Sequence, residues 1–129
     1  MFQLVYISSA VGSLHTREVL DVSRRNNARD GITGLLYFDG RRFLQALEGE
    51  RLAVERTYAR ILTDRRHRAA VVLSRTEVAQ REFGAWTMAE RAPGVDGDAF
   101  VAQVSALVAN ASPAVRATFD GFVQVRRAA

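Results

Sequence analysis

The chain has 129 residues and a formal net charge of +4, with 48% hydrophobic and 25% charged residues. These values are typical of one soluble globular domain with a sizeable core. Cysteine is absent, which excludes disulfides, thiolate metal sites, cysteine nucleophiles and cysteinyl–cofactor adducts. All 18 basic residues are arginine, so a P-loop lysine and a Schiff base are excluded as well.

Charge and hydropathy also limit the partners that we expect. No apolar run approaches the roughly 20 residues needed to span a bilayer, and the start "MFQLVYISS" lacks the features of a signal peptide. We therefore expect a cytoplasmic protein with no membrane partner. The arginines are scattered and rarely interleaved with aromatic residues, a pattern that does not favour binding to nucleic acid. His15 and His67 are far apart in the sequence, so we expect no metal site.

The first predicted elements are a strand and a helix. Residues 2–8 alternate and are β-prone, and one face of this strand carries Phe2, Leu4, Tyr6 and Ser8. Residues 13–28 predict a helix that an Asp-Gly pair ends. Its apolar stripe, followed at seven-residue spacing, reaches Asn26 and Asn27 in the last turn. Two amides thus fall on the buried side of the helix, where they need hydrogen-bond partners.

A hairpin is predicted next. Residues 32–38 and 41–48 form its strands, and the Asp-Gly pair between them is a strong turn signal, because both central residues of a type I′ turn adopt positive φ. On the second strand, Gln45 shares one face with Phe43 and Leu47. A polar amide therefore belongs to an otherwise apolar face.

The remaining pattern completes an α+β fold. A helix is predicted over 51–65, and its apolar side carries Val54, Tyr58, Ile61 and Leu62. Strands are predicted over 70–78 and 84–90. The order β-α-β-β-α-β-β matches the ferredoxin-like plan, with two helices on one sheet face.

The C-terminal part is predicted to be helical. Two amphipathic helices, over 96–109 and 112–127, follow a break at an Ala-Pro-Gly sequence. We expect a first domain over 1–92 and a helical extension over 93–129. The extension either covers the second sheet face or mediates self-association, and a homodimer or higher homo-oligomer is expected.

Three polar side chains converge in this plan. The first and third strands are central neighbours, so Tyr6 and Gln45 share a face that also meets the end of the first helix, with Asn27. A phenol and two carboxamides in apolar surroundings indicate a pocket for a planar heterocycle. Each residue also has a structural interpretation: a tyrosine at a core edge, an asparagine C-cap, or a glutamine bonded to backbone. Only their joint placement supports the pocket.

The stretches "VYISSA", "NNARDGITGLLYFDGRRFLQALEGE", "ILTDRRH" and "FGAWTM" resemble the BLUF domains, the family of flavin-binding blue-light sensors. The resemblance covers about residues 1–92. It implies a non-covalent flavin, FAD with FMN as the alternative, held between the two helices that flank the sheet. Tyr6 matches the photoactive tyrosine of the family, and Gln45 matches its switching glutamine.

The resemblance also implies roles for other residues. The implied cofactor-binding residues are Asn26, Asn27, Ser8, Arg60, Asp64, Arg66 and His67. Trp86 and Met88 match a signal-relay pair on the last strand. Structural alternatives remain open: an i,i+4 ion pair for Arg60 with Asp64, a basic helix C-terminus for Arg66 and His67, and a core or subunit contact for Trp86.

The implied function is a light switch and not an enzyme. Flavin excitation would drive reversible electron and proton transfer with Tyr6 and would rearrange the hydrogen bonds of Gln45. The signal would pass through protein contacts to an unidentified downstream partner, because the sequence carries no appended output domain. The alternatives are a ferredoxin-like module that binds flavin or nucleic acid without photosensing, and an acylphosphatase-like hydrolase. The loop "SSAVGSLHT" lacks the anion-binding character that the hydrolase would need.

Overall fold

The computed structural model describes residues 1–10, 29–38, 41–63, 67–81, 87–91 and 95–128. The helix predicted over 13–28 and the Asp-Gly hairpin turn lie outside these residues. The candidate site residues Asn26, Asn27, Asp64, Arg66 and Trp86 also lie outside them, so their expected roles stay predictions.

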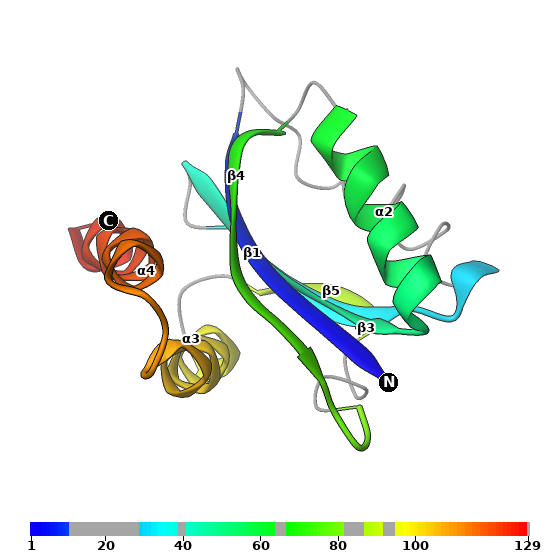
Figure 1. Ribbon diagram of the computed structural model, residues 1–129. Helices are drawn as coiled ribbons and strands as arrows, with labels where there is room; N and C mark the ends of the chain where they lie inside the picture. The colour runs from blue at the N-terminus through cyan, green and yellow to red at the C-terminus, as the bar shows by residue number, and fades with distance from the viewer. Residues whose placement is uncertain (11–28, 39–40, 64–66, 82–86, 92–94, 129) are drawn as a thin grey trace.

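The described residues form a five-stranded sheet. Its strands are β1 (Phe2–Ala10), β2 (Thr33–Phe38), β3 (Arg42–Gly49), β4 (His67–Glu77) and β5 (Thr87–Arg91). The order in the sheet is β4-β1-β3-β2-β5, which places β1 and β3 side by side in the interior (Figure 1). β4, β1, β3 and β2 pair antiparallel, and β5 pairs parallel to β2. This confirms the predicted ferredoxin-like α+β fold.

Helices cover both faces of this sheet. Helix α2 (Arg51–Thr63) lies on one face, while α3 (Val95–Val108) and α4 (Pro113–Ala128) lie on the other (Figure 1). Successive residues of a strand point to opposite faces, so the strands contribute to two separate apolar clusters. One cluster lies on the α2 side of the sheet and the other on the α3–α4 side. The C-terminal helices therefore cover the second sheet face, one of the two roles that the sequence left open.

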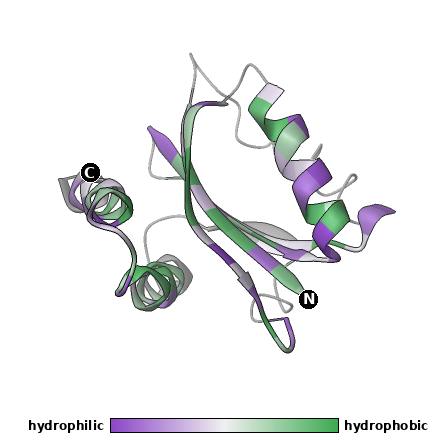
Figure 2. Cartoon of the chain, in the orientation of Figure 1, coloured by the Kyte–Doolittle hydropathy of each residue, from purple (hydrophilic) through white to green (hydrophobic). Residues whose placement is uncertain are grey.

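Helix α2 buries a slightly different stripe from the predicted one. Hydrophobic and hydrophilic residues alternate around it, as in an amphipathic helix (Figure 2). Val54 and Tyr58 are buried as expected, but Leu62 is 54% exposed and Thr57 is buried instead. At 3.6 residues per turn, Leu62 lies about 80° around the helix from Val54, beyond the edge of the buried stripe.

The start of β4 differs from the sequence-based expectation. The described part of α2 extends to Thr63, and β4 begins at His67, three residues before the predicted strand. His67 therefore belongs to a strand, paired with Ala10 of β1, and not to a basic helix C-terminus. The helix end predicted at the Asp30-Gly31 pair agrees with the structure. Residues 29–30 are helical, and Gly31 ends the helix with φ of 67°, the left-handed conformation that glycine adopts without strain.

Strand β4 is irregular. Its pairing with β1 shifts between Val5 and Tyr6 and again between Ile7 and Ser9, and at each shift β4 contributes one more residue than β1. Ala69 lies in the second irregularity with φ of 52°, a left-handed conformation that is uncommon for a residue with a Cβ. Bulges of this kind bend a strand and increase its twist, and β4 is strongly curved in Figure 1. None of the helices that the structure describes is long and apolar enough to cross a membrane.

Candidate functional site

The centre of the candidate site is a hydrogen bond between two interior strands. Tyr6 of β1 and Gln45 of β3 are direct register partners, and the Tyr6 hydroxyl donates to Oε1 of Gln45. Both side chains are buried, with exposures of 0% and 3%. The alternation of the sequence predicted that they share one sheet face, and the structure confirms it.

Apolar and aromatic side chains surround this pair. The α2-side cluster that contains Tyr6 also includes Leu4, Phe43 and Leu47 from the same two strands. The ring of Tyr58, from α2, lies 5.0 Å from the ring of Tyr6 and is tilted by 58°. Burial raises the pKa of the Tyr58 phenol, and the positive charge of Arg75 partly opposes this effect. A hydrogen-bonded phenol and amide thus face α2 inside a dry, aromatic layer.

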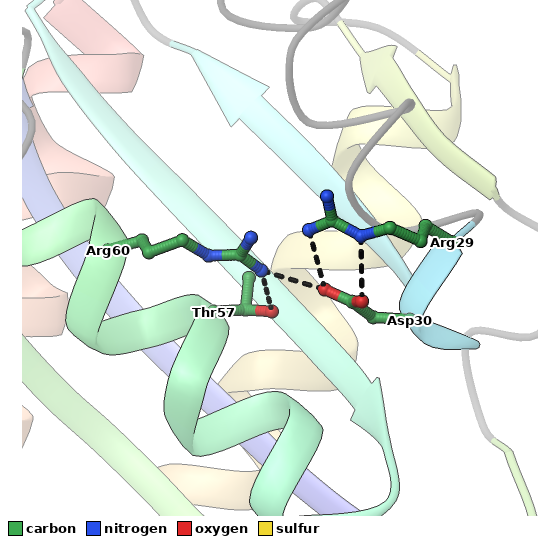
Figure 3. A network of polar contacts seen from close by, with 4 residues as sticks. All are labelled: Arg29, Asp30, Thr57 and Arg60. Carbon is green, nitrogen blue, oxygen red and sulfur yellow. Dashed lines mark hydrogen bonds and ion pairs between the residues drawn. The ribbon is translucent and has the colours of Figure 1, made fainter.

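A second group of polar residues joins α2 to the helical residues 29–30 (Figure 3). Arg60 of α2 donates from Nη2 to Oδ2 of Asp30, at 2.8 Å, and to Oγ1 of Thr57, at 3.1 Å. Arg29 donates from Nε to Oδ1 of Asp30, at 3.1 Å. The hydrogen bonds from Arg29 and Arg60 lower the pKa of the Asp30 carboxyl to about 2. The carboxylate therefore stays ionised at any pH near neutrality.

Sequence reasoning missed the part played by Asp30. The sequence predicts only a helix end at the Asp30-Gly31 pair. It assigns Arg60 to the cofactor, with Asp64 as its neighbour on the same helix. In the structure the guanidinium of Arg60 reaches across to Asp30, 30 residues earlier in the chain. Local spacing carries no signal for such a contact, because it depends on how α2 and the helical residues 29–30 are placed relative to each other.

The other described candidates occupy different parts of the sheet. Ser8 is buried on β1, opposite Phe43, so it lies on the same strand and face as Tyr6. His67 is at the start of β4, and Met88 is on the edge strand β5. The structure thus brings Ser8 to the Tyr6–Gln45 pair.

Two further polar clusters were not expected from the sequence. On the sheet face opposite Gln45, Gln3 Nε2 donates to Oε2 of Glu48, at 2.9 Å, and both residues are completely buried. Arg81, in the segment after β4, donates to three acceptors at the ends of other segments. The sequence offered one signal for the first cluster: Gln3 and Glu48 each interrupt an apolar strand face.

The described residues offer no metal centre, because they contain no group of three or more His, Asp or Glu residues placed to hold an ion. Their chemistry suits a different ligand. A buried donor–acceptor pair on an apolar sheet face fits an aromatic heterocycle with polar atoms along its edge. The fold and the site together define a module suited to binding such a heterocycle.

Comparison with known proteins identifies the family. The family model "BLUF: Sensors of blue-light using FAD" matches residues 1–89, and the chain belongs to this BLUF family. FAD is the chromophore of the family, and the Tyr6–Gln45 pair in its apolar layer fits a flavin. The family that the sequence resemblance implied is thereby confirmed.

Curated relatives match part of this chain. It is 36% identical over 67 residues to the blue light- and temperature-regulated antirepressor BluF of Escherichia coli K12, a match that covers 52% of this chain and 17% of that protein. It is 33% identical over 89 residues to the beta subunit of the photoactivated adenylate cyclase of Euglena longa, which covers 66% of this chain and 10% of the subunit. The chain thus spans less than a fifth of either relative.

Solved structures show the same fold. BlsA in its photo-activated state superposes with a TM-score of 0.71 at 25% identity, covering 92% of this chain and 90% of BlsA. A bacterial light-regulated adenylyl cyclase has a TM-score of 0.69 at 34% identity, covering 92% of this chain and 35% of the cyclase. Klebsiella pneumoniae BlrP1 with FMN and cyclic diGMP has a TM-score of 0.69 at 29% identity, covering 80% of this chain and 29% of BlrP1.

Proposed function

We propose that Tyr6 and Gln45 are the photoactive pair of this sensor. The observation that carries this proposal is their buried hydrogen bond on the apolar sheet face toward α2. A phenol is a redox-active side chain with a transferable proton, and a carboxamide has both a donor end and an acceptor end. The two groups together can therefore exchange a proton and afterwards bond differently.

A bound flavin would supply absorption of blue light and, once excited, would act as a one-electron oxidant. Tyr6 would supply the electron to it, and the hydroxyl proton of Tyr6 would move toward Oε1 of Gln45, which already accepts its hydrogen bond. The electron and the proton would both return to Tyr6 in the back-transfer, so no bond would be permanently broken. Rotation or tautomerisation of the Gln45 amide in between leaves a changed set of donors and acceptors at the site.

Other residues are assigned to bind the flavin together with Tyr6 and Gln45. Residues assigned to hold the flavin are Ser8, Asn26, Asn27, Arg60, Asp64, Arg66 and His67. The described members support this assignment in part: Ser8 is buried beside the photoactive pair, and Arg60 is held on α2 by Asp30 and Thr57. Arg60 is 42% exposed as a side chain, so its guanidinium retains polar surface for a ligand.

The output is a change in protein contacts and not a chemical reaction. We assign residues 1–92 to the sensor domain and 93–129 to a helical extension, with Trp86 and Met88 as relay residues near β5. The altered Gln45 hydrogen bonds bias β5 and the C-terminal helices between two arrangements. An unidentified downstream protein, or a second copy of the chain in a homo-oligomer, then recognises the altered surface in the cytoplasm. The antirepressor and cyclase relatives are consistent with outputs that lie outside the shared region.

A nucleic-acid-binding module is a weaker alternative. Binding of single-stranded RNA on a ferredoxin-like sheet uses exposed aromatic side chains on a bare face. Here α2 lies on one face and α3 and α4 on the other. Among the side chains that the structure describes, the exposed large hydrophobics are Met1, Leu52 and Leu62, none of them aromatic.

The spectrum of the purified protein tests the proposal. We expect a flavin absorption spectrum, a small red shift of the flavin band under blue light, and its complete reversal in the dark. The control is the same illumination of free FAD, which contains no Tyr6–Gln45 pair. Folded protein that binds no flavin when FAD is added, or bound flavin whose band does not respond to light, would refute the proposal.

A further inference from the structure

Arg81 connects three separate segments at one end of the sheet. Its Nη1 donates to Oγ1 of Thr33, at 2.7 Å, and to the backbone oxygen of Glu48, at 2.9 Å. Its Nη2 donates to the backbone oxygen of Gly31, also at 2.9 Å. One guanidinium thus bonds to the start of β2, to the end of β3 and to the turn that follows the helical residues 29–30.

The three acceptors lie close together because the backbone there is unusually tight. A Cβ placed on Gly49 would lie 3.2 Å from the backbone oxygen of Gly31 and 3.3 Å from Cγ1 of Ile32. The end of β3 and the turn before β2 therefore approach each other so closely that a side chain at position 49 would require its neighbours to shift. This approach brings the carbonyl groups within reach of a single planar guanidinium, whose donors point in fixed directions.

Arg81 and the acceptors of its three hydrogen bonds, here called the Arg81 anchor, also lie close to the start of β5. Arg81 precedes Thr87, the first residue of β5, by six residues. The parallel pairing of β5 with β2 begins at Gly34 and Thr87, next to the Thr33 that Arg81 holds. The following pair is Leu35 with Ala89, so Met88 is an extra residue on β5 at the register shift. The anchor and the irregular start of β5 therefore lie at the same end of β2.

We propose that Arg81 is a positioning residue that fixes the chain at the start of β2, next to the first pairing of β5 with that strand. This proposal rests on the assignment of β5 to signal relay. Arg81 is part-buried, and its three hydrogen bonds fix its position in the fold. It precedes β5, whose pairing with β2 begins with a register shift. A fixed point six residues before Thr87 limits the registers that β5 can adopt against β2, and it therefore favours the return of β5 to one register after each excitation. Arg81 thereby shortens the lifetime of the light-adapted state.

The test compares Arg81→Lys and Arg81→Gln with the wild-type holoprotein. Lysine keeps the charge but cannot reproduce three directed bonds to separate acceptors. In both variants we expect flavin content and the size of the light-induced red shift to be unchanged. Dark recovery should slow by about tenfold, the size expected when one hydrogen bond from a charged donor is lost. Thr33→Val removes one acceptor only, and it should slow recovery less.

Hydrogen exchange gives a second readout that does not depend on light. In the dark, amides of Thr87 to Glu90 should exchange faster in the Arg81 variants, while those of α2 keep their wild-type rates. Arg75→Lys is the matched control, because Arg75 lies on β4 and forms an ion pair with Glu55 at an exposed position. Wild-type recovery and wild-type β5 exchange in both Arg81 variants would overturn the proposal. If the wild type itself shows no light response, the photosensor assignment fails, whereas the exchange result still decides whether Arg81 anchors β5.

Discussion

The most direct test of the site is Tyr6→Phe, which removes one hydroxyl and keeps the ring. Tyr6 is completely buried, and its hydroxyl donates to Oε1 of Gln45, which is 3% exposed. The substitution takes a donor from a buried acceptor, and such a loss costs about 1–2 kcal/mol of unfolding free energy. For a domain of this size the expected fall in melting temperature is about 4–8 °C. The ring stays in the aromatic layer beside Tyr58, so we expect the fold and flavin binding to persist.

The functional effect of Tyr6→Phe should be far larger than its effect on stability. Without the phenolic proton, the variant should bind FAD and show no light-induced red shift. The assay is an absorption spectrum before and after blue illumination, together with thermal unfolding at saturating FAD. The matched control is Tyr58→Phe, which removes a hydroxyl from a ring only 5.0 Å away but leaves the Tyr6–Gln45 bond in place. A normal red shift in Tyr6→Phe, or its loss in Tyr58→Phe alone, would show that the hydrogen-bonded pair was wrongly assigned.

Three further predictions follow from other parts of the structure. Gln45→Leu should also abolish the red shift while flavin stays bound, as absorption spectroscopy would show; a shift of normal size would exclude Gln45 as the switch. Asp30→Asn should lower the urea midpoint at neutral pH, and because the pKa of Asp30 is lowered from 3.8 to about 2, its stabilising effect is present above about pH 4 and disappears as the pH falls toward 2. A difference between wild type and variant that stays constant over this range would contradict the ion-pair assignment. Phe122→Ala should cost about 3–5 kcal/mol, since Phe122 is completely buried, whereas Leu62→Ala, at an exposed position of α2, should change the unfolding free energy by less than about 0.5 kcal/mol; equal effects of the two substitutions would contradict the docking of α4 on the sheet.

Periodicity in the sequence was sufficient to predict the core of the site. Alternation on two strands placed Tyr6 and Gln45 on apolar faces, and the ferredoxin-like order made those strands neighbours. Both inferences use local rules, a period of two residues and a known connection pattern. They needed no knowledge of side-chain contacts, and the register confirms them.

Contacts between distant segments could not be predicted in the same way. Arg81 bonds to groups 33 to 50 residues away, and Arg60 of α2 bonds to Asp30, 30 residues earlier in the chain. These contacts depend on the relative placement of whole elements, and an exposed-looking arginine in the sequence carries no period or spacing that reveals its partner. The error at Leu62 has a simpler cause: an apolar residue at the margin of a helical stripe was counted as part of it, although a 100° step per residue takes it out of the core.

The irregular pairing of β4 affects whether another chain can pair with this edge of the sheet. β4 is an edge strand, and a flat edge would present a row of backbone donors and acceptors to any extended chain nearby. Two extra residues and the left-handed Ala69 interrupt that row and curve it, so a foreign strand finds no continuous ladder to extend. This edge is thereby protected against cross-β aggregation, and a partner that approaches from this side has to recognise side chains instead of adding to the sheet.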